Sequence, residues 1–198
     1  MDPFAPAPLH VLLVRTALTY EEGRQGPRHS PYARSVVSHL SEAARDEVPE
    51  LTPRASVGQM SFATIPWLAL LDRRVTTTVT RGVYVVFLIE PSHPRVVLAM
   101  VNGAQDVCRE HGYAEGRAIL RRRGAALRTL LADHAERFEP PPIDLNSPLD
   151  LPRAYEAAYA FGRTYDARGI DPLRFRADLD AMRAAYADYA ARVLPEAA

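Results

Sequence analysis

Lysine is missing from the sequence: all 24 basic residues among its 198 are arginine. A phosphate-binding loop of the Walker type needs a Gly-Lys-Ser/Thr step, so that site for nucleotide hydrolysis is excluded. Schiff-base chemistry and a lysine general base are excluded for the same reason, as is the common nuclease site that pairs acidic metal ligands with a lysine. The 24 acidic residues balance the arginines, so net charge indicates no particular partner.

Cysteine and long apolar runs are also scarce. Cys108 is the single cysteine, which rules out an intrachain disulfide and a thiolate metal cluster and indicates a reducing compartment. No apolar run approaches the roughly 20 residues that span a bilayer, and the first residues lack the basic start of a signal peptide. We therefore expect a cytoplasmic protein without a membrane partner.

Residue patterns for catalysis are lacking too. No two of the six histidines have the i, i+4 spacing of a helical zinc site, and Cys108 with His111 lacks two further ligands. There is no Gly-x-Ser-x-Gly elbow and no glycine-rich dinucleotide turn. Asp178 and Asp180 lie two positions apart on a predicted helix and so do not share a face. We predict a protein that is not an enzyme and uses no cofactor and no metal.

The residues in the middle of the chain have the pattern of a β-sheet. Residues 54–103 hold most of the β-branched residues. Three short apolar runs lie there, at 67–72, 83–90 and 95–101, and each has the length of a strand. The segments that join them are shorter than the crossover of a dozen or more residues that parallel strands need, so the runs are predicted to pair antiparallel.

Helical spacing of apolar residues predicts five helices around this sheet. Pro152 suits the first turn of one of them, and Gly169 closes it. The predicted helices cover residues 9–20, 32–40, 114–138, 152–169 and 172–193. We predict one α+β domain over 1–198, in which a curved, largely antiparallel β-sheet is flanked by N- and C-terminal helices. Its predicted parts are a helical N-terminal part (1–53), the sheet core (54–103) and a helical C-terminal part (104–198).

Arginine is unevenly distributed although the total charge is zero. Residues 109–128 contain six Arg and two Glu, and residues 54–82 contain four Arg and one Asp. A basic patch on a neutral protein can mark a surface that binds phosphates. It can also be the solvated face of a helix, which is the interpretation we favour for the predicted helix around Arg122.

The most informative stretch runs from 58 to 103 and reads GQMSFATIPWLALLDRRVTTTVTRGVYVVFLIEPSHPRVVLAMVNG. Its marks are, in order, Gly58, Phe62, Ile65-Pro66-Trp67, Thr76 to Thr78 and Gly82-Val83-Tyr84. A second block runs from Tyr155 to Gly169 and on through Ile170-Asp171 to Phe175. Taken together and in this order, the blocks resemble one family: the N-terminal DNA-binding domain of the modified-cytosine restriction protein McrB, with its stand-alone and nuclease-fused relatives.

The resemblance implies a function and a set of residues. Such domains bind duplex DNA that contains 5-methylcytosine or a related modified cytosine, and they flip that base into a pocket. A nuclease effector domain or subunit then cuts the DNA, in a modification-dependent (type IV) restriction system. On this chain the implied pocket residues are Trp67, Tyr84, Leu88 and Tyr155, with the base stacked between the Trp and a Tyr.

Further contacts to DNA follow from the same resemblance and from charge. Where the family offers an aromatic wedge that fills the gap left by the flipped base, this chain has Gln59 and Met60, either of which could act as the wedge. Arg73, Arg74 and Arg81 are the candidate phosphate contacts. The alternative for these three arginines is a solvated hairpin loop.

Packing offers a structural alternative for every pocket residue. Tyr84 and Leu88 share one face of a strand because they are four residues apart, and both fit an ordinary sheet core. Trp67 and Tyr155 could equally be core residues. Two other functions remain open: a module of the same fold that reads another modified base or RNA, and an enzyme or helical interaction protein that shares only the strand pattern.

Overall fold

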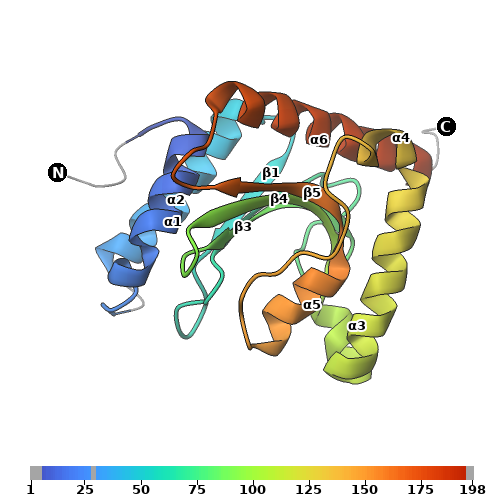
Figure 1. Ribbon diagram of the computed structural model, residues 1–198, viewed down its shortest axis with the longest axis horizontal. Coiled ribbons are helices and arrows are strands. Elements are labelled where there is room, and N and C mark those ends of the chain that lie inside the picture. Colours follow the sequence, from blue (N-terminus) through green and yellow to red (C-terminus); the bar gives the residue numbers. More distant parts are fainter. Residues whose placement is uncertain (1–5, 28–29, 195–198) are drawn as a thin grey trace.

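A single open sheet of five strands forms the centre of the molecule, shown in Figure 1 as a computed structural model that describes residues 6–27 and 30–194. The strand order is β1-β2-β3-β4-β5, and each strand pairs antiparallel with its neighbour. The strands are β1 (Thr52–Ser56), β2 (Trp67–Leu71), β3 (Val83–Glu90), β4 (Arg95–Asn102) and β5 (Tyr159–Asp166). The prediction of an α+β fold with a curved antiparallel sheet flanked by helices is confirmed.

Helices surround this sheet on both faces. Within the described residues they are α1 (Leu9–Gly23), α2 (Pro31–Glu47), α3 (Gln105–Leu130), α4 (Ala132–Ala135), α5 (Asp150–Ala158) and α6 (Pro172–Val193). Local sequence explains where two of them begin. Ser30 and Asp171 each cap the N-terminus of a helix by accepting a backbone N–H, and a proline follows each of them.

The two faces of the sheet are covered differently. Figure 1 shows α6 along one face and α5 beneath the other, with α3 standing at the edge. On the α6 face, Phe87 of β3 stacks on Phe175 with ring centroids 5.7 Å apart, and Tyr165 of β5 lies 5.8 Å from the same ring. All three rings are buried. This face is therefore closed by interlocking aromatic side chains, and we call it the closed face.

The C-terminal part differs from the prediction of helices alone. The helix expected over 152–169 ends at Ala158, and β5 follows directly and pairs with β4. Tyr159, Phe161 and Tyr165 of β5 are buried against the sheet. Phe161 and Tyr165 pair with Met100 and Val96 of β4, and their spacing of four puts them on one face of the strand.

Three element boundaries also lie elsewhere than predicted. Helix α2 continues through the acidic segment after Leu40, where Ala44 is buried, so this segment is not a free loop. Strand β1 begins inside the part predicted to be helical. Helix α3 begins at Gln105, well before the predicted start at 114, and Gly112 interrupts it with a φ of 73°. A glycine that tolerates positive φ allows this kink without strain.

Candidate functional site

Strand register places three of the implied pocket residues on one face of the sheet. Trp67 of β2 lies directly opposite Leu88 of β3, so their side chains emerge side by side. Tyr84 lies four residues before Leu88 on the same strand and shares that face. Phe87 points to the other face of the sheet, and helix α5 lies beneath the face that carries Trp67 and Leu88. We call it the open face because it encloses a cavity.

This cavity, which we name the Trp67 cavity, has a volume of about 160 Å³. Trp67 and Leu88 line it from the sheet, and Pro152 and Tyr155 line it from α5. The other lining residues come from the loop before β2 (Ala63, Thr64 and Ile65), from the first residue of α3 (Gln105), from the segment that leads into α5 (Leu145 and Leu149), and from α5 itself (Leu151). Sequence segments more than eighty residues apart thus meet around one small, mostly apolar space.

Tyr84 lies deeper than the other three implied pocket residues. It is 1% exposed and is not part of the cavity wall. Its hydroxyl donates to the carbonyl of Val79 at 2.8 Å and lies 3.1 Å from the hydroxyl of Tyr155. The hydroxyl of Tyr155 also lies 3.4 Å from the Val79 carbonyl, so the two hydroxyls and this carbonyl form one hydrogen-bonded group. Tyr84 therefore holds the ring of Tyr155 in position through the contact between their hydroxyls.

Burial sets the ionisation of this tyrosine pair. Burial raises the pKa of Tyr84 well above its ordinary value of 10.0, and the neighbouring Tyr155 raises it further. Burial likewise raises the pKa of Tyr155, which the hydrogen bond with Tyr84 partly offsets. Both phenols are neutral at physiological pH, so the cavity presents an uncharged aromatic wall.

One rim of the Trp67 cavity is held by a buried carboxylate. Glu90, at the end of β3, is 0% exposed. It accepts from Nε of Arg95 at 2.8 Å and from Nδ2 of Asn146 at 2.7 Å. Arg95 also donates to the carbonyl of Asp144 at 2.9 Å. The segment around Leu145 is thus tied to the β3–β4 hairpin through side chains that satisfy a buried charge.

The opposite rim continues into the loop that carries the implied wedge. Gly58 opens this loop with a φ of 103°, and a Cβ there would lie 2.0 Å from the carbonyl oxygen of Ser61. The N–H of Ala63 donates to the carbonyl of Val57 at 2.8 Å and closes the base of the loop. The Tyr20 hydroxyl lies within hydrogen-bond distance of the carbonyls of Val57 and Ala63. Gln59 is exposed, and Met60 is 98% exposed at the tip.

The three candidate arginines differ in their surroundings. Arg74 forms a two-pronged pair with Asp72, from Nε to Oδ1 at 3.0 Å and from Nη2 to Oδ2 at 2.6 Å. Arg73 and Arg81 are exposed and line a shallow hollow of about 370 Å³ over the Thr-rich loop between β2 and β3. The hydrogen bonds of the pair lower the pKa of Asp72 and occupy the guanidinium fork of Arg74.

Sequence reasoning missed the polar groups of the Trp67 cavity. Gln105 contributes a side-chain amide, and the Thr64 hydroxyl lies at the wall, 3.4 Å from the hydroxyl of Ser147. Neither residue belongs to a motif, and each comes from a segment far from Trp67 in sequence. The Asn102-Gly103 turn marks where α3 approaches the sheet, but it does not show that Gln105 would face the cavity.

Other kinds of site are not found in the described part of the chain. Residues 6–27 and 30–194 contain no group of three or more His, Cys, Asp or Glu side chains that could hold a metal ion. No helix within the same ranges is long and apolar enough to cross a bilayer. The Trp67 cavity and the exposed loops beside it are therefore the features on which a functional conclusion rests.

Comparison with known families agrees with this geometry. The model of the family described as MrcB-like, N-terminal domain, matches residues 20–191. Domains of this kind are DNA-binding modules of restriction-type systems. The chain belongs to the MrcB-like N-terminal domain family, as the blocks around Trp67 and Tyr155 had indicated. A comparison with curated proteins gives no match.

Proposed function

We propose that this domain reads 5-methylcytosine, or a related modified cytosine, in duplex DNA by flipping the base into the Trp67 cavity. It would act in the cytoplasm as the targeting module of a modification-dependent (type IV) restriction system. Catalysis would belong to a nuclease on another domain or subunit. The observation that carries this proposal is that Trp67, Leu88 and Tyr155 line one cavity, although Tyr155 is far from the other two in sequence.

The size and lining of the cavity suit a single base. Its volume of about 160 Å³ is below the roughly 300–1,000 Å³ of pockets that hold drug-sized ligands, and its walls are mostly apolar. Flipping a base costs a few kcal/mol, and stacking on aromatic side chains returns about 1–3 kcal/mol per base. Burial of the added methyl group contributes only about 0.8 kcal/mol. Discrimination against plain cytosine is therefore modest unless the wall fits the methyl group closely.

Polar groups at the wall would orient the base. The amide of Gln105 offers one donor and one acceptor, and the pairing edge of cytosine offers an amino donor beside a ring-nitrogen acceptor. Two hydrogen bonds from one amide would therefore match this edge. Thr64 supplies a hydroxyl that can donate or accept at the other side.

The exposed loops would hold the duplex around the flipped base. Met60, exposed at the tip of the loop that Tyr20 holds, would enter the gap that the base leaves, with Gln59 beside it. Arg73 and Arg81 are free to contact phosphates, whereas Arg74 would first have to leave Asp72. We propose the first two as the main phosphate contacts of this loop.

A binding panel tests the proposal. One duplex is prepared with cytosine, 5-methylcytosine, 5-hydroxymethylcytosine or N6-methyladenine at a single site, and its mobility shift is measured with the wild-type domain. We expect tighter binding to a modified-cytosine duplex. Equal affinity across the panel would overturn the proposal. A preference for N6-methyladenine, or for an RNA of the same sequence, would replace it with the alternative reader of the same fold.

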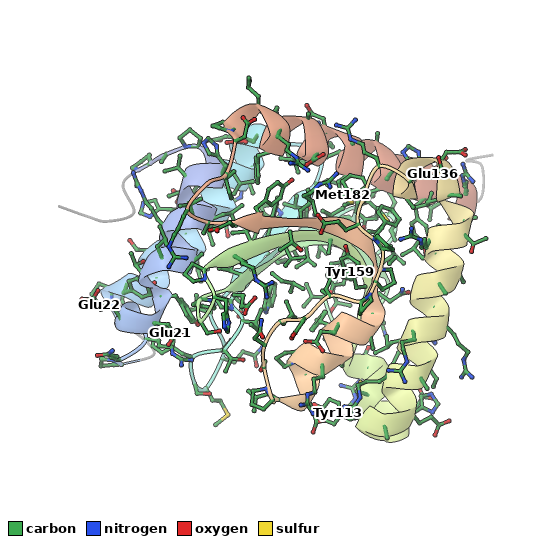
Figure 2. All side chains as sticks on the ribbon, in the orientation of Figure 1. Glu21, Glu22, Tyr113, Glu136, Tyr159 and Met182 are labelled. Carbon is green, nitrogen blue, oxygen red and sulfur yellow. The ribbon has the colours of Figure 1, made fainter. Side chains whose placement is uncertain are left out.

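Trp67→Ala is the decisive variant in the same assay. Because Trp67 is only half-buried, the variant should remain folded, and it should lose the preference for the modified duplex. Tyr113→Ala is the matched control, since Tyr113 is an exposed aromatic residue on α3 and not a part of the cavity wall (Figure 2). A folded Trp67→Ala variant that kept the full preference would contradict the proposal.

A further inference from the structure

A second hollow lies between α3 and α5, and three arginines line it. Its volume is about 480 Å³. Arg117 and Arg121 line it from α3, and Arg153 lines it from α5. Tyr159 forms its inner end, and Figure 2 shows this residue where α5 passes into β5. We call this space the α3–α5 hollow.

Spacing along α3 explains why the arginines gather. Arg117, Arg121 and Ala125 are four residues apart and share one side of the helix. Gly124 allows α3 to approach closely, because a Cβ there would lie 2.8 Å from the carbonyl oxygen of Tyr159. The arginine side of α3 is therefore held against the end of α5. Arg122 and Arg123, next along the helix, are exposed, as expected for the solvated face favoured from the sequence.

The cations of the hollow are incompletely neutralised. Arg117 pairs with Asp150 at 2.9 Å. Arg121 and Arg153 form no ion pair within the described residues. The one carboxylate in the wall, Glu156, accepts the N–H of Leu145 at 2.8 Å, and burial raises its pKa. The charge of Arg153 partly offsets this upward shift, so three guanidinium groups share the hollow with a single wall carboxylate.

Arg128 adds an independent observation. It follows Arg121 by seven residues and so lies on the same side of α3. One of its terminal nitrogens, Nη1, is buried and has no hydrogen-bond partner among the described residues. Its charge acts on Tyr159, whose pKa it lowers against the larger upward effect of burial. Arg128 does not line the hollow itself, so it adds positive charge beside Tyr159 and not a direct contact.

We propose that the α3–α5 hollow binds a phosphoryl group. Guanidinium groups present paired donors in a plane that matches the oxygens of a phosphate. Two sources share this chemistry: a backbone phosphate of the bound DNA, and a small phosphorylated ligand. The position of the hollow favours DNA, because α5 carries the Trp67 cavity on its other side.

Helix geometry gives the reach between the two sites. On α5, Pro152 and Tyr155 face the Trp67 cavity, whereas Arg153 and Ala157 face the α3–α5 hollow. A helix is about 10–12 Å wide, and successive phosphates of one strand are about 3.4 Å apart along the duplex axis. A strand whose base occupies the cavity could therefore place a phosphate about three steps away in the hollow. This part of the inference rests on the proposed DNA-reading function.

The test compares two double variants that remove equal charge from neighbouring positions. Arg121→Gln with Arg153→Gln removes the two unpaired groups of the hollow. Arg122→Gln with Arg123→Gln is the control, since both residues are exposed on α3 outside the hollow. Circular dichroism checks that both variants fold. Affinity for an unmodified and a 5-methylcytosine duplex is then measured across a range of salt concentrations.

If a DNA phosphate occupies the hollow, the slope of log affinity against log salt should fall by about 1 in the Arg121/Arg153 variant and much less in the control. The preference for the modified base should stay unchanged, because both duplexes lose the same contact. This result is separable from failure of the reading proposal, which would abolish the preference in the wild type while leaving the slope measurable.

Titration with inorganic phosphate covers the second source and needs no DNA. In the wild type, phosphate should shift the Nε–Hε resonances of Arg121 and Arg153 in NMR spectra, and it should protect the protein against heat only while these arginines are present. If the Arg121/Arg153 variant and the control have equal salt slopes, and phosphate binds in this way, the hollow is assigned to a small phosphorylated ligand. Equal slopes without phosphate binding would overturn the inference.

Discussion

The two faces of the central sheet use the same kinds of side chain in opposite ways. On the closed face, Phe87 stacks on Phe175 and leaves no opening. On the open face, the adjacent residue Leu88 shares a cavity of about 160 Å³ with Trp67 and Tyr155. Close packing normally fills the interior of a protein. Aromatic residues that surround unfilled space are therefore better explained by a ligand than by stability, and four predictions test this contrast.

The largest effect is expected on the closed face. Phe87→Ala removes a fully buried ring from its stack with Phe175 and should lower the free energy of unfolding by about 3–5 kcal/mol. Trp67→Ala should cost clearly less, because Trp67 is half-buried beside a cavity. Urea unfolding of both variants measures the difference. Equal losses would show that the open face is packed as tightly as the closed one.

Filling the cavity should separate binding from stability. Leu88→Phe adds ring atoms where a base would stack, so affinity for the modified duplex should fall about 5- to 150-fold, since stacking is worth about 1–3 kcal/mol. Leu98→Phe makes the same change opposite Phe87 on the closed face, where overpacking should cost about 1–3 kcal/mol of stability and spare binding. The comparison is wrong if Leu88→Phe leaves DNA binding intact.

A smaller effect is expected at the loop beside the open face. Arg73→Gln and Arg81→Gln should each reduce the salt slope of DNA binding by about 1, as for one lost phosphate contact. Arg74→Gln should leave the slope nearly unchanged, because its guanidinium is paired with Asp72. Fluorescence anisotropy at several salt concentrations measures all three. An equal reduction for Arg74→Gln would mean that this pair opens when DNA binds.

The smallest effect concerns pH. Hydrogen bonds from Arg74 lower the pKa of Asp72 below its ordinary value of 3.8. The charged form is favoured by folding, so this contribution to stability is present above about pH 3.8 and is lost as pH falls through the lowered pKa. Asp72→Asn should therefore lower the urea midpoint at pH 7 and match the wild type more closely near pH 2. A constant difference at both pH values would exclude this linkage.

Local pattern was enough to predict β2, β3 and β4, but neither β1 nor β5. The runs at 83–90 and 95–101 are apolar and bounded by turns, so periodicity and short connections specify their antiparallel pairing. The segment 159–166 mixes alanine, glycine and arginine with aromatic residues, and its strand conformation depends on pairing with β4. Tertiary pairing of this kind overrides local propensity.

The candidate site was predictable only as far as the family resemblance reached. Trp67 and Leu88 come together through strand register, which the sequence implies once the strands are aligned. Tyr155 reaches the cavity through the path of the chain after α3, which no local pattern specifies. Gln105 faces the cavity, and Arg121 faces the α3–α5 hollow, because α3 begins early and packs against α5. Such placements follow from packing between helices and not from spacing.

The anchoring of the segment around Leu145 has a consequence for engineering. Three hydrogen bonds tie the segment to the sheet and to α5: Asn146 to Glu90, Arg95 to the carbonyl of Asp144, and the N–H of Leu145 to Glu156. None of them uses the side chain of Leu145 itself. That side chain can therefore be exchanged while its backbone stays in position. Replacing Leu145 with smaller or larger residues offers a way to retune which chemical group on a base the domain accepts.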